Sequence, residues 1–195
     1  IVENYLASKY GISITNDKFA YDVSYGHEIA GIGRETATDT HTDAQSAGIL
    51  EVDNPSGLNA NQEYLLWGHE NSGVNSWTTN EAPNGGTNIQ RLAREWKFDE
   101  TREVGSVRFT IDTTSFLARP TNYCKFALMV DADGDFSSGA SVYEMTSPGN
   151  NELYEVSGID MNDGDHVAIG CVRPTVAFST ASSSGFEPNI SPDFQ

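Results

Sequence analysis

Three aspartates at alternate positions, Asp131, Asp133 and Asp135, are the residues whose types and spacing most clearly suggest chemistry. They follow directly after the apolar run of residues 126–130. In D-x-D-x-D loops, alternate carboxylates converge on one hard cation, and calcium–oxygen distances are about 2.3–2.6 Å. The spacing therefore predicts a calcium site in the loop that begins at Asp131.

The rest of this loop departs from the EF-hand pattern. Counted from the first aspartate, the sixth position is Phe136 where glycine is expected, and the twelfth is Val142 where a bidentate glutamate is expected. Two interpretations are open: an acidic hairpin turn, or a calcium loop between two strands that is completed by backbone carbonyls near Ser137 and by Ser141 or Glu144. In the calcium interpretation, the predicted ligands are Asp131, Asp133, Asp135, Ser137 and Glu144.

Four histidines, at positions 27, 41, 69 and 166, belong to no HExxH or HxH motif. His27 and His69 are each followed by a glutamate, so the two His-Glu pairs could converge in the folded chain. A hydrolase that uses His27 or His69 with a carboxylate would need a deep cleft with perturbed titrating groups. The sequence contains no nucleophile elbow and no phosphate-binding loop. We therefore expect a protein without catalytic activity.

Trp77 stands in a long segment rich in Asn, Gly and Thr, residues 71–88. This segment has little periodicity and is predicted to be a surface loop. Together with Tyr64, Trp67 and Trp96, which are near it in sequence, Trp77 could offer an aromatic platform for sugar rings. We predict Trp77 as a ligand-binding residue, and packing that anchors the loop is the alternative.

The elements that must position these residues are mostly short and apolar. Runs rich in β-branched and aromatic residues, separated by clusters of Gly, Asn, Asp, Pro and Ser, predict about ten strands. No helical pattern lies between the runs, so the expected fold is an all-β antiparallel sandwich or jelly roll. Apolar residues at near-helical spacing over 1–10 predict one short N-terminal helix. The acidic segment 161–166 is predicted to be a hairpin turn.

The two cysteines are predicted to point into the core. Alternation places Cys124 on the face of Phe126 and Leu128, and Cys171 on the face of Ile169. A disulfide forms only if the strands bring the two Cα atoms within about 7 Å. A bridge and two buried thiols are equally open on this basis.

Net charge limits the partners of the chain. Its 195 residues include 28 acidic and 11 basic side chains, and the formal net charge is -17. Such a field repels phosphate backbones and anionic lipid headgroups. No stretch approaches the roughly 18 apolar residues that span a bilayer. We therefore expect neither nucleic acid binding nor membrane insertion.

Several segments resemble known families. IVENYLASKYGISI, at residues 1–14, resembles the closing helix and strand of concanavalin-like, laminin-G-type jelly-roll domains. Four further segments resemble the uncharacterised β-rich domain that follows such jelly rolls in secreted Bacteroidetes surface proteins. They are YGHEIAGIGRE, EYLLWGHENSG, QRLAREWKFDETREVGSV and FALMVDADGDFSSGASVYEM. The REW and DADGDF blocks are the most specific parts.

This resemblance implies three regions. Residues 1–14 are then the end of a preceding concanavalin-like domain, or else an integral N-terminal helix. Residues 15–175 form the β-sandwich domain, and residues 176–195, rich in Ser and Pro, form a linker or tail.

The resemblance also implies an extracellular, non-catalytic structural or adhesive module of an adhesin-like protein at the cell surface. Its expected partners are neighbouring domains of the same polypeptide, and glycans or further copies of the protein. We expect calcium at the aspartate loop to stabilise the module, because a ligand that binds only the folded state stabilises that state. A calcium-dependent carbohydrate-binding module is the alternative function.

Overall fold

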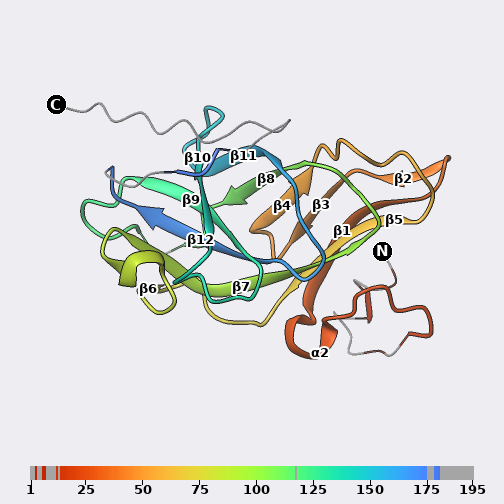
Figure 1. Cartoon of the computed structure of the whole chain (residues 1–195), viewed down its shortest axis with the longest axis horizontal. Coiled ribbons are helices and arrows are strands. Elements are labelled where there is room, and N and C mark those ends of the chain that lie inside the picture. Colours follow the sequence, from red (N-terminus) through yellow and green to blue (C-terminus); the bar gives the residue numbers. More distant parts are fainter. Residues whose placement is uncertain are drawn as a thin grey trace.

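Two antiparallel sheets form the protein (Figure 1). The computed structural model describes residues 3, 6, 7, 12, 14–116, 118–174 and 178–180. Within them are twelve strands, so the predicted all-β antiparallel sandwich is confirmed with slightly more strands than expected. Most of the predicted N-terminal helix and of the predicted tail lies outside the described residues. A short helix, α2 (Asp22–Tyr25), precedes the first strand.

The larger sheet has eight strands and the smaller has four. Neighbours in the larger sheet follow the order β10-β9-β12-β7-β5-β1-β2, and β6 pairs with β7. Its strands are β1 (His27–Thr36), β2 (Asp39–His41), β5 (Glu63–His69), β6 (Trp77–Thr78), β7 (Ile89–Thr101), β9 (Lys125–Asp131), β10 (Ser141–Met145) and β12 (His166–Val172). The smaller sheet has the order β11-β8-β4-β3, with β3 (Asp43–Ser46), β4 (Leu50–Asp53), β8 (Val107–Asp112) and β11 (Leu153–Ile159). A 3-10 turn, η1 (Pro83–Gly86), lies before β7.

The main core lies between the two sheets. In β8, Val107, Phe109 and Ile111 alternate along the strand and are all buried, as the period of two in the sequence predicts. The ring of Phe98 in β7 lies 5.6 Å from the ring of Trp67 and 5.6 Å from that of Phe109, centroid to centroid. These aromatic contacts join the larger sheet to the smaller one.

The larger sheet is also covered on its outer face, which points away from the smaller sheet. Leu66 of β5 points to this face, where it packs with Phe19 from the segment before α2. Phe136, from the loop after β9, packs on the same face against Met129. Because both faces are covered, β5 and β12 are buried at every residue.

The two sheets are joined at their sides. β2 ends at His41 and β3 begins at Asp43, so the chain passes from the larger sheet to the smaller one within one residue. Beyond the other edge strand, Thr146 exchanges two backbone hydrogen bonds with Glu155 of β11. The hairpin prediction for residues 161–166 is wrong, because this segment joins β11 in the smaller sheet to β12 in the larger one.

One of the two cysteine predictions is wrong. Cys171 is fully buried in β12, whereas Cys124 is exposed and precedes the first residue of β9. The alternation of β9 begins at Lys125, so it does not extend to Cys124. Both thiols are free. Burial raises the pKa of the Cys171 thiol to about 12, which keeps it protonated at neutral pH.

Candidate functional site

The aspartate loop connects β9 to β10, which pair as an antiparallel hairpin. Asp131 Oδ1 accepts the backbone N–H groups of Asp133 and Gly134, each at 2.9 Å. Asp133 Oδ1 accepts the N–H of Asp135 at 2.9 Å, and Asp135 Oδ1 accepts that of Ser137 at 3.1 Å. One oxygen of each carboxylate thus shapes the turn, as aspartates commonly do in loops.

Two of these carboxyl groups also interact directly. Burial raises the pKa of Asp131 and the neighbouring carboxyl group of Asp133 also raises it, whereas the backbone N–H groups of Asp133 and Gly134 lower it. The backbone N–H of Asp135 lowers the pKa of Asp133. The ionisation of Asp131 and that of Asp133 are therefore linked, while the turn hydrogen bonds already use one oxygen of each carboxylate.

Phe136 explains why the loop departs from the EF-hand pattern. Its side chain is fully buried against the outer face of the larger sheet, and the guanidinium of Arg91 lies 5.3 Å from its ring centroid. Gly134 has a φ of +86° and lies against His166, whose Nδ1 would be 3.0 Å from a Cβ at that position. The sixth position of the loop is thus an apolar anchor, and the fourth position needs glycine.

The structure does not bring all five predicted ligands together. Glu144 pairs in the ladder with Ala127, four residues before Asp131 and roughly 13 Å from it along the strand. Its carboxylate forms an ion pair with Lys125, with 2.5 Å between Nζ and Oε1. Ser137 is exposed at the end of the turn. Asp131, Asp133 and Asp135 also do not place one oxygen each within 4.8 Å of the others, so the structure does not show the predicted convergence of the three carboxylates.

A second group of carboxylates, which the sequence analysis missed, lies on the outer face of the smaller sheet. Asp43, Glu51 and Asp53 each place one potential ligand atom within 4.8 Å of the others. Within the described part of the chain, no other group of three His, Cys, Asp or Glu side chains converges in this way. Antiparallel pairing of β3 with β4 sets Asp43 opposite Asp53, while Val52 points into the core. We call these three residues the acidic triad.

The charge of the acidic triad is only partly neutralised. Arg108 Nε donates to Asp53 Oδ1 at 2.8 Å, its Nη2 pairs with the other Asp53 oxygen, and its Nη1 lies 3.5 Å from Glu155. Burial raises the pKa of Glu51, and the charges of Asp43 and Asp53 raise it further. One guanidinium therefore faces four carboxyl groups, and a divalent cation would relieve their repulsion.

The structure brings the two His-Glu pairs together, because His27 and His69 are opposite each other on β1 and β5. Their rings are stacked, with centroids 5.8 Å apart. His69 Nδ1 accepts the backbone N–H of Asn71 at 3.0 Å. Burial lowers the pKa of His69 to about 3, so it is neutral at pH 7.

The hydrogen bond from the backbone N–H of Asn71 determines which ring nitrogen of His69 carries the proton. With Nδ1 acting as an acceptor, the single proton of the neutral ring lies on Nε2, which is 3.7 Å from Glu28 Oε2. Nε2 then has no lone pair for a metal ion, and Nδ1 is already used by the backbone. The arrangement does not favour His69 as a zinc ligand or as a general base.

Trp77 is half-buried and packs in the β6 region. Its Nε1 donates to the carbonyl oxygen of Ala118 at 3.2 Å, and its ring lies 6.4 Å from that of Phe116 and 6.2 Å from that of Phe126. These contacts anchor the long loop, and packing of this kind was the alternative to a ligand-binding role for Trp77. A role for Trp77 in binding sugars stays a prediction.

Comparison with known families adds one finding. The family model described as "Domain of unknown function (DUF8202)" matches residues 1–165. No curated protein and no solved structure shows significant similarity to the chain. Among the described residues, no helix has the length and apolar character needed to cross a membrane.

Proposed function

The chain belongs to the DUF8202 family, and we propose that it is a non-catalytic structural or adhesive module stabilised by calcium. The observation that carries this proposal is the acidic triad, in which Asp43, Glu51 and Asp53 converge within 4.8 Å. Pairing of β3 with β4 sets Asp43 opposite Asp53, and Glu51, two residues before Asp53, lies on the same face of β4. A bound cation would remove the repulsion that folding creates.

The aspartate loop is the second cation site of the proposal. Its support is the effect of Asp131 and Asp133 on each other's pKa and the anchoring of the loop by Phe136. Because the loop is shaped by its own hydrogen bonds, little ordering remains for a cation to bring about there. At one hundred times its dissociation constant, a cation bound only to the folded state adds about 2.7 kcal/mol to the free energy of unfolding.

The proposed setting is a secreted, multidomain bacterial surface protein, as the sequence resemblance implies. Calcium-binding modules outside cells have dissociation constants of about 10⁻⁴–10⁻³ M, which suits sites built from few ligands. In such a protein, calcium would stiffen the module against its neighbouring domains. The net charge of -17 supports a role in which cations, and not anions, are bound.

A calcium titration of the melting temperature tests the proposal and separates the two sites. After removal of metal with EDTA, we expect calcium to raise the melting temperature saturably and by more than sodium chloride does at equal ionic strength. Glu51→Gln should abolish the part of the rise that belongs to the acidic triad, and Asp133→Asn the part that belongs to the loop. A melting temperature of the wild-type protein that rises no more with calcium than with sodium chloride at equal ionic strength would refute the proposal.

A calcium-dependent carbohydrate-binding module is the second candidate. It is favoured by the half-buried aromatic cluster of Trp77 and Phe116, beside which Arg119 lies 4.5 Å from the ring centroid of Phe126. Aromatic rings next to polar groups are typical of sugar sites. Glycan-array binding that disappears in Trp77→Ala would favour this function over the structural one.

A further inference from the structure

Strand β10 forms one edge of the larger sheet, in which its neighbour is β9. In an antiparallel pair, successive residues direct their backbone N–H and C=O groups alternately toward the partner strand and away from it. Val142 and, just past the strand, Thr146 direct these groups away from β9, because both bond to residues outside it. An edge of this kind can pair with a further extended segment, and folded proteins usually cover it.

Two other parts of the chain cover this edge. Just past β10, Thr146 pairs with Glu155 of β11 (Figure 1). Near the start of β10, the backbone N–H of Ser179 donates to the carbonyl oxygen of Val142 at 2.6 Å, and the N–H of Val142 donates to Ser179 Oγ at 3.1 Å. The serine hydroxyl thus takes the place of the carbonyl group that a regular strand partner would offer.

Phe178 holds the same segment on the outer face of the sheet. Its half-buried ring packs against the apolar cluster that includes Met129 and Val142. The ammonium of Lys125 lies 5.3 Å from the ring centroid, a distance at which a cation favours an aromatic side chain over an aliphatic one. We call the surface formed by Lys125, Met129 and Val142 the β10 edge site. Its contacts suit an aromatic residue followed by a residue with a hydroxyl group.

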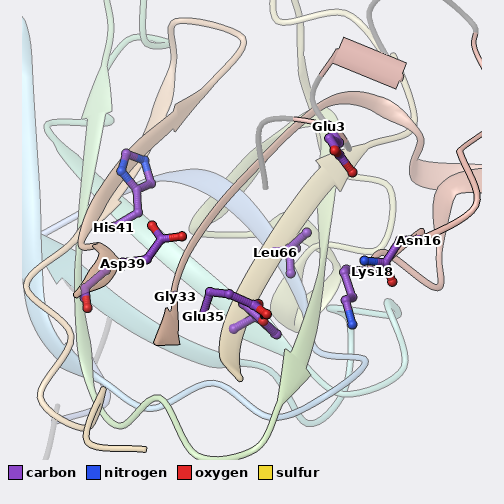
Figure 2. A pocket seen from close by; sticks show the side chains of 10 residues that line it. Glu3, Asn16, Lys18, Gly33, Glu35, Asp39, His41 and Leu66 are labelled. Atoms are coloured by element: carbon purple, nitrogen blue, oxygen red, sulfur yellow. The ribbon is translucent and has the colours of Figure 1, made fainter. Parts of the chain in front are cut away.

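The outer face of the larger sheet is open at its other end. A groove of about 490 Å³ lies there over β1 and β5, between the β1–β2 hairpin and the segment before α2 (Figure 2). Gly33 and Leu66 line it, and none of the described lining residues belongs to the β10 edge site. The groove and the β10 edge site are therefore separate surfaces.

From these contacts we propose that the β10 edge site is a peptide-binding site of the strand-addition type, which this chain fills with its own residues 178–180. These residues act as a removable strap, and an extended peptide with the same aromatic–hydroxyl pair binds when the strap is displaced. They fall in the region that the sequence analysis expected to be a linker or tail, so part of that region has a role in the folded domain. Neither proposed cation site includes the strap or its contacts, so the inference goes beyond the calcium-stabilised module.

The strap is held by few contacts and by a short connection. Ser179 and Thr180 are exposed, and residues 173–177 separate Phe178 from the end of β12 at Val172. A ligand on a short tether has an effective concentration on the order of millimolar. A free peptide at micromolar concentration therefore competes poorly with the intact strap, whereas a weakened strap leaves the site available.

Fluorescence anisotropy with a labelled peptide of residues 174–182 tests this inference on the full chain. The double variant Phe178→Ala/Ser179→Ala removes the ring and the hydroxyl by which the strap is held. We expect this variant to bind the peptide saturably, and at least about tenfold more tightly than the wild-type protein does. A peptide with alanine in place of Phe178 should not bind. Failure of the double variant to bind the unaltered peptide would overturn the inference.

Two control variants separate release of the strap from other effects. Thr180→Ala removes an exposed hydroxyl one residue beyond the bonded one. Asp39→Asn changes an exposed residue of the groove at the other end of the sheet. Both should bind the peptide as weakly as the wild-type protein does. Equal binding by the controls and by the double variant would contradict a site that the strap covers.

Hydrogen exchange reports on the strap directly. The amides of residues 142 and 179 donate hydrogen bonds in the closed site, so they should exchange more slowly in the wild-type protein than in the double variant. Equal exchange rates would show that the strap does not cover the edge. Circular dichroism checks that each variant is folded, and Ser179→Ala alone serves if the double variant is not.

Size-exclusion chromatography distinguishes a strap within one chain from exchange between copies. We expect the wild-type protein to be a monomer at micromolar concentration. A wild-type dimer that the double variant does not form would assign residues 178–180 to the edge of a second copy, and would overturn the arrangement proposed. The calcium response of the melting temperature that belongs to the acidic triad should be the same with and without the strap substitutions, which separates this inference from the proposed function.

Discussion

At the scale of single residues, burial sets the charge of several carboxyl groups, and Glu100 in β7 shows the effect most strongly. Its Oε1 accepts the backbone N–H of Val104 at 2.9 Å. Burial, assisted by the charges of Glu103 and Asp160, raises the pKa of Glu100 from 4.5 to about 7. The folded protein therefore binds this proton more tightly than the unfolded chain. The resulting stabilisation is complete below pH 4.5 and is lost as the pH rises through 7.

Glu100→Gln should remove this pH dependence. The amide oxygen can still accept the N–H of Val104, while the buried negative charge at high pH is gone. We expect the variant to exceed the wild-type protein in free energy of unfolding by about 1–2 kcal/mol at pH 8, since the side chain is half-exposed and solvent reduces the effect. At pH 5 the two proteins should be nearly equal. Urea unfolding at both pH values measures this, and an identical difference at both would contradict the assigned pKa.

Single residues were predicted from sequence only where their spacing along the chain carries the signal. The alternation of Asp131, Asp133 and Asp135 predicted a calcium site, whereas the structure shows one oxygen of each carboxylate accepting a backbone N–H of the turn, and the three side chains do not converge within 4.8 Å. The acidic triad was missed because Asp43 and Asp53 meet through the register of β3 and β4. Register is a property of two strands, so no local pattern near either residue reveals it.

At the scale of elements, loops of this protein are held to the sheets by apolar anchors. The β9–β10 loop is fixed by Phe136, which is fully buried with Met129 and Val142. The sequence analysis counted Phe136 as a departure from a calcium motif, whereas the structure shows that it has a packing role. An isolated large apolar residue in an acidic loop thus predicts contact with a covered sheet face.

Phe136→Ala should destabilise the protein by about 3–5 kcal/mol, the usual range for removal of a buried phenylalanine. The lost contacts lie under the loop, so amides of residues 132–140 should also exchange faster with solvent. Ser138→Ala, at an exposed position in the same loop, is the matched control and should leave both quantities unchanged. Differential scanning calorimetry and hydrogen exchange give the two readouts. Equal effects of the two substitutions would show that Phe136 does not anchor the loop.

The sequence predicted the strands themselves better than it predicted how they are connected and paired. Alternating apolar residues correctly predicted the all-β class, including the buried face of Val107, Phe109 and Ile111 in β8. The segment 161–166 was wrongly predicted to be a hairpin turn. Its composition indicates that the chain turns, but it does not indicate which sheet the next strand joins. Likewise Cys124 was placed in the core by extending an alternation beyond the end of β9. The first error concerns long-range pairing, and the second concerns the residue at which a strand begins, which sequence patterns place only approximately.

At the scale of the whole molecule, repulsion between the excess acidic side chains opposes the compact folded state. The chain carries 28 acidic and 11 basic side chains, and those of the two sheets are held in a compact structure. Several basic residues are already engaged in ion pairs, such as Arg91 with Glu81 and Arg108 with Asp53. The remaining carboxylates repel one another more in the compact state than in the unfolded chain. Stability should therefore depend on the ionic conditions of the whole solution as well as on specific cation sites.

Sodium chloride should consequently stabilise the folded state, with a rising urea midpoint and an unchanged slope of unfolding. The Debye length falls from about 30 Å at 0.01 M to about 10 Å at 0.1 M salt, which screens repulsion between distant carboxylates first. Short ion pairs such as Arg91–Glu81 respond less, because their partners are in contact. Urea titrations across this range of salt measure the effect, and the calcium response above that of sodium then isolates cation binding. A midpoint that falls with salt would mean that attractive pairs outweigh repulsion, and that the net charge of -17 is not a general source of instability.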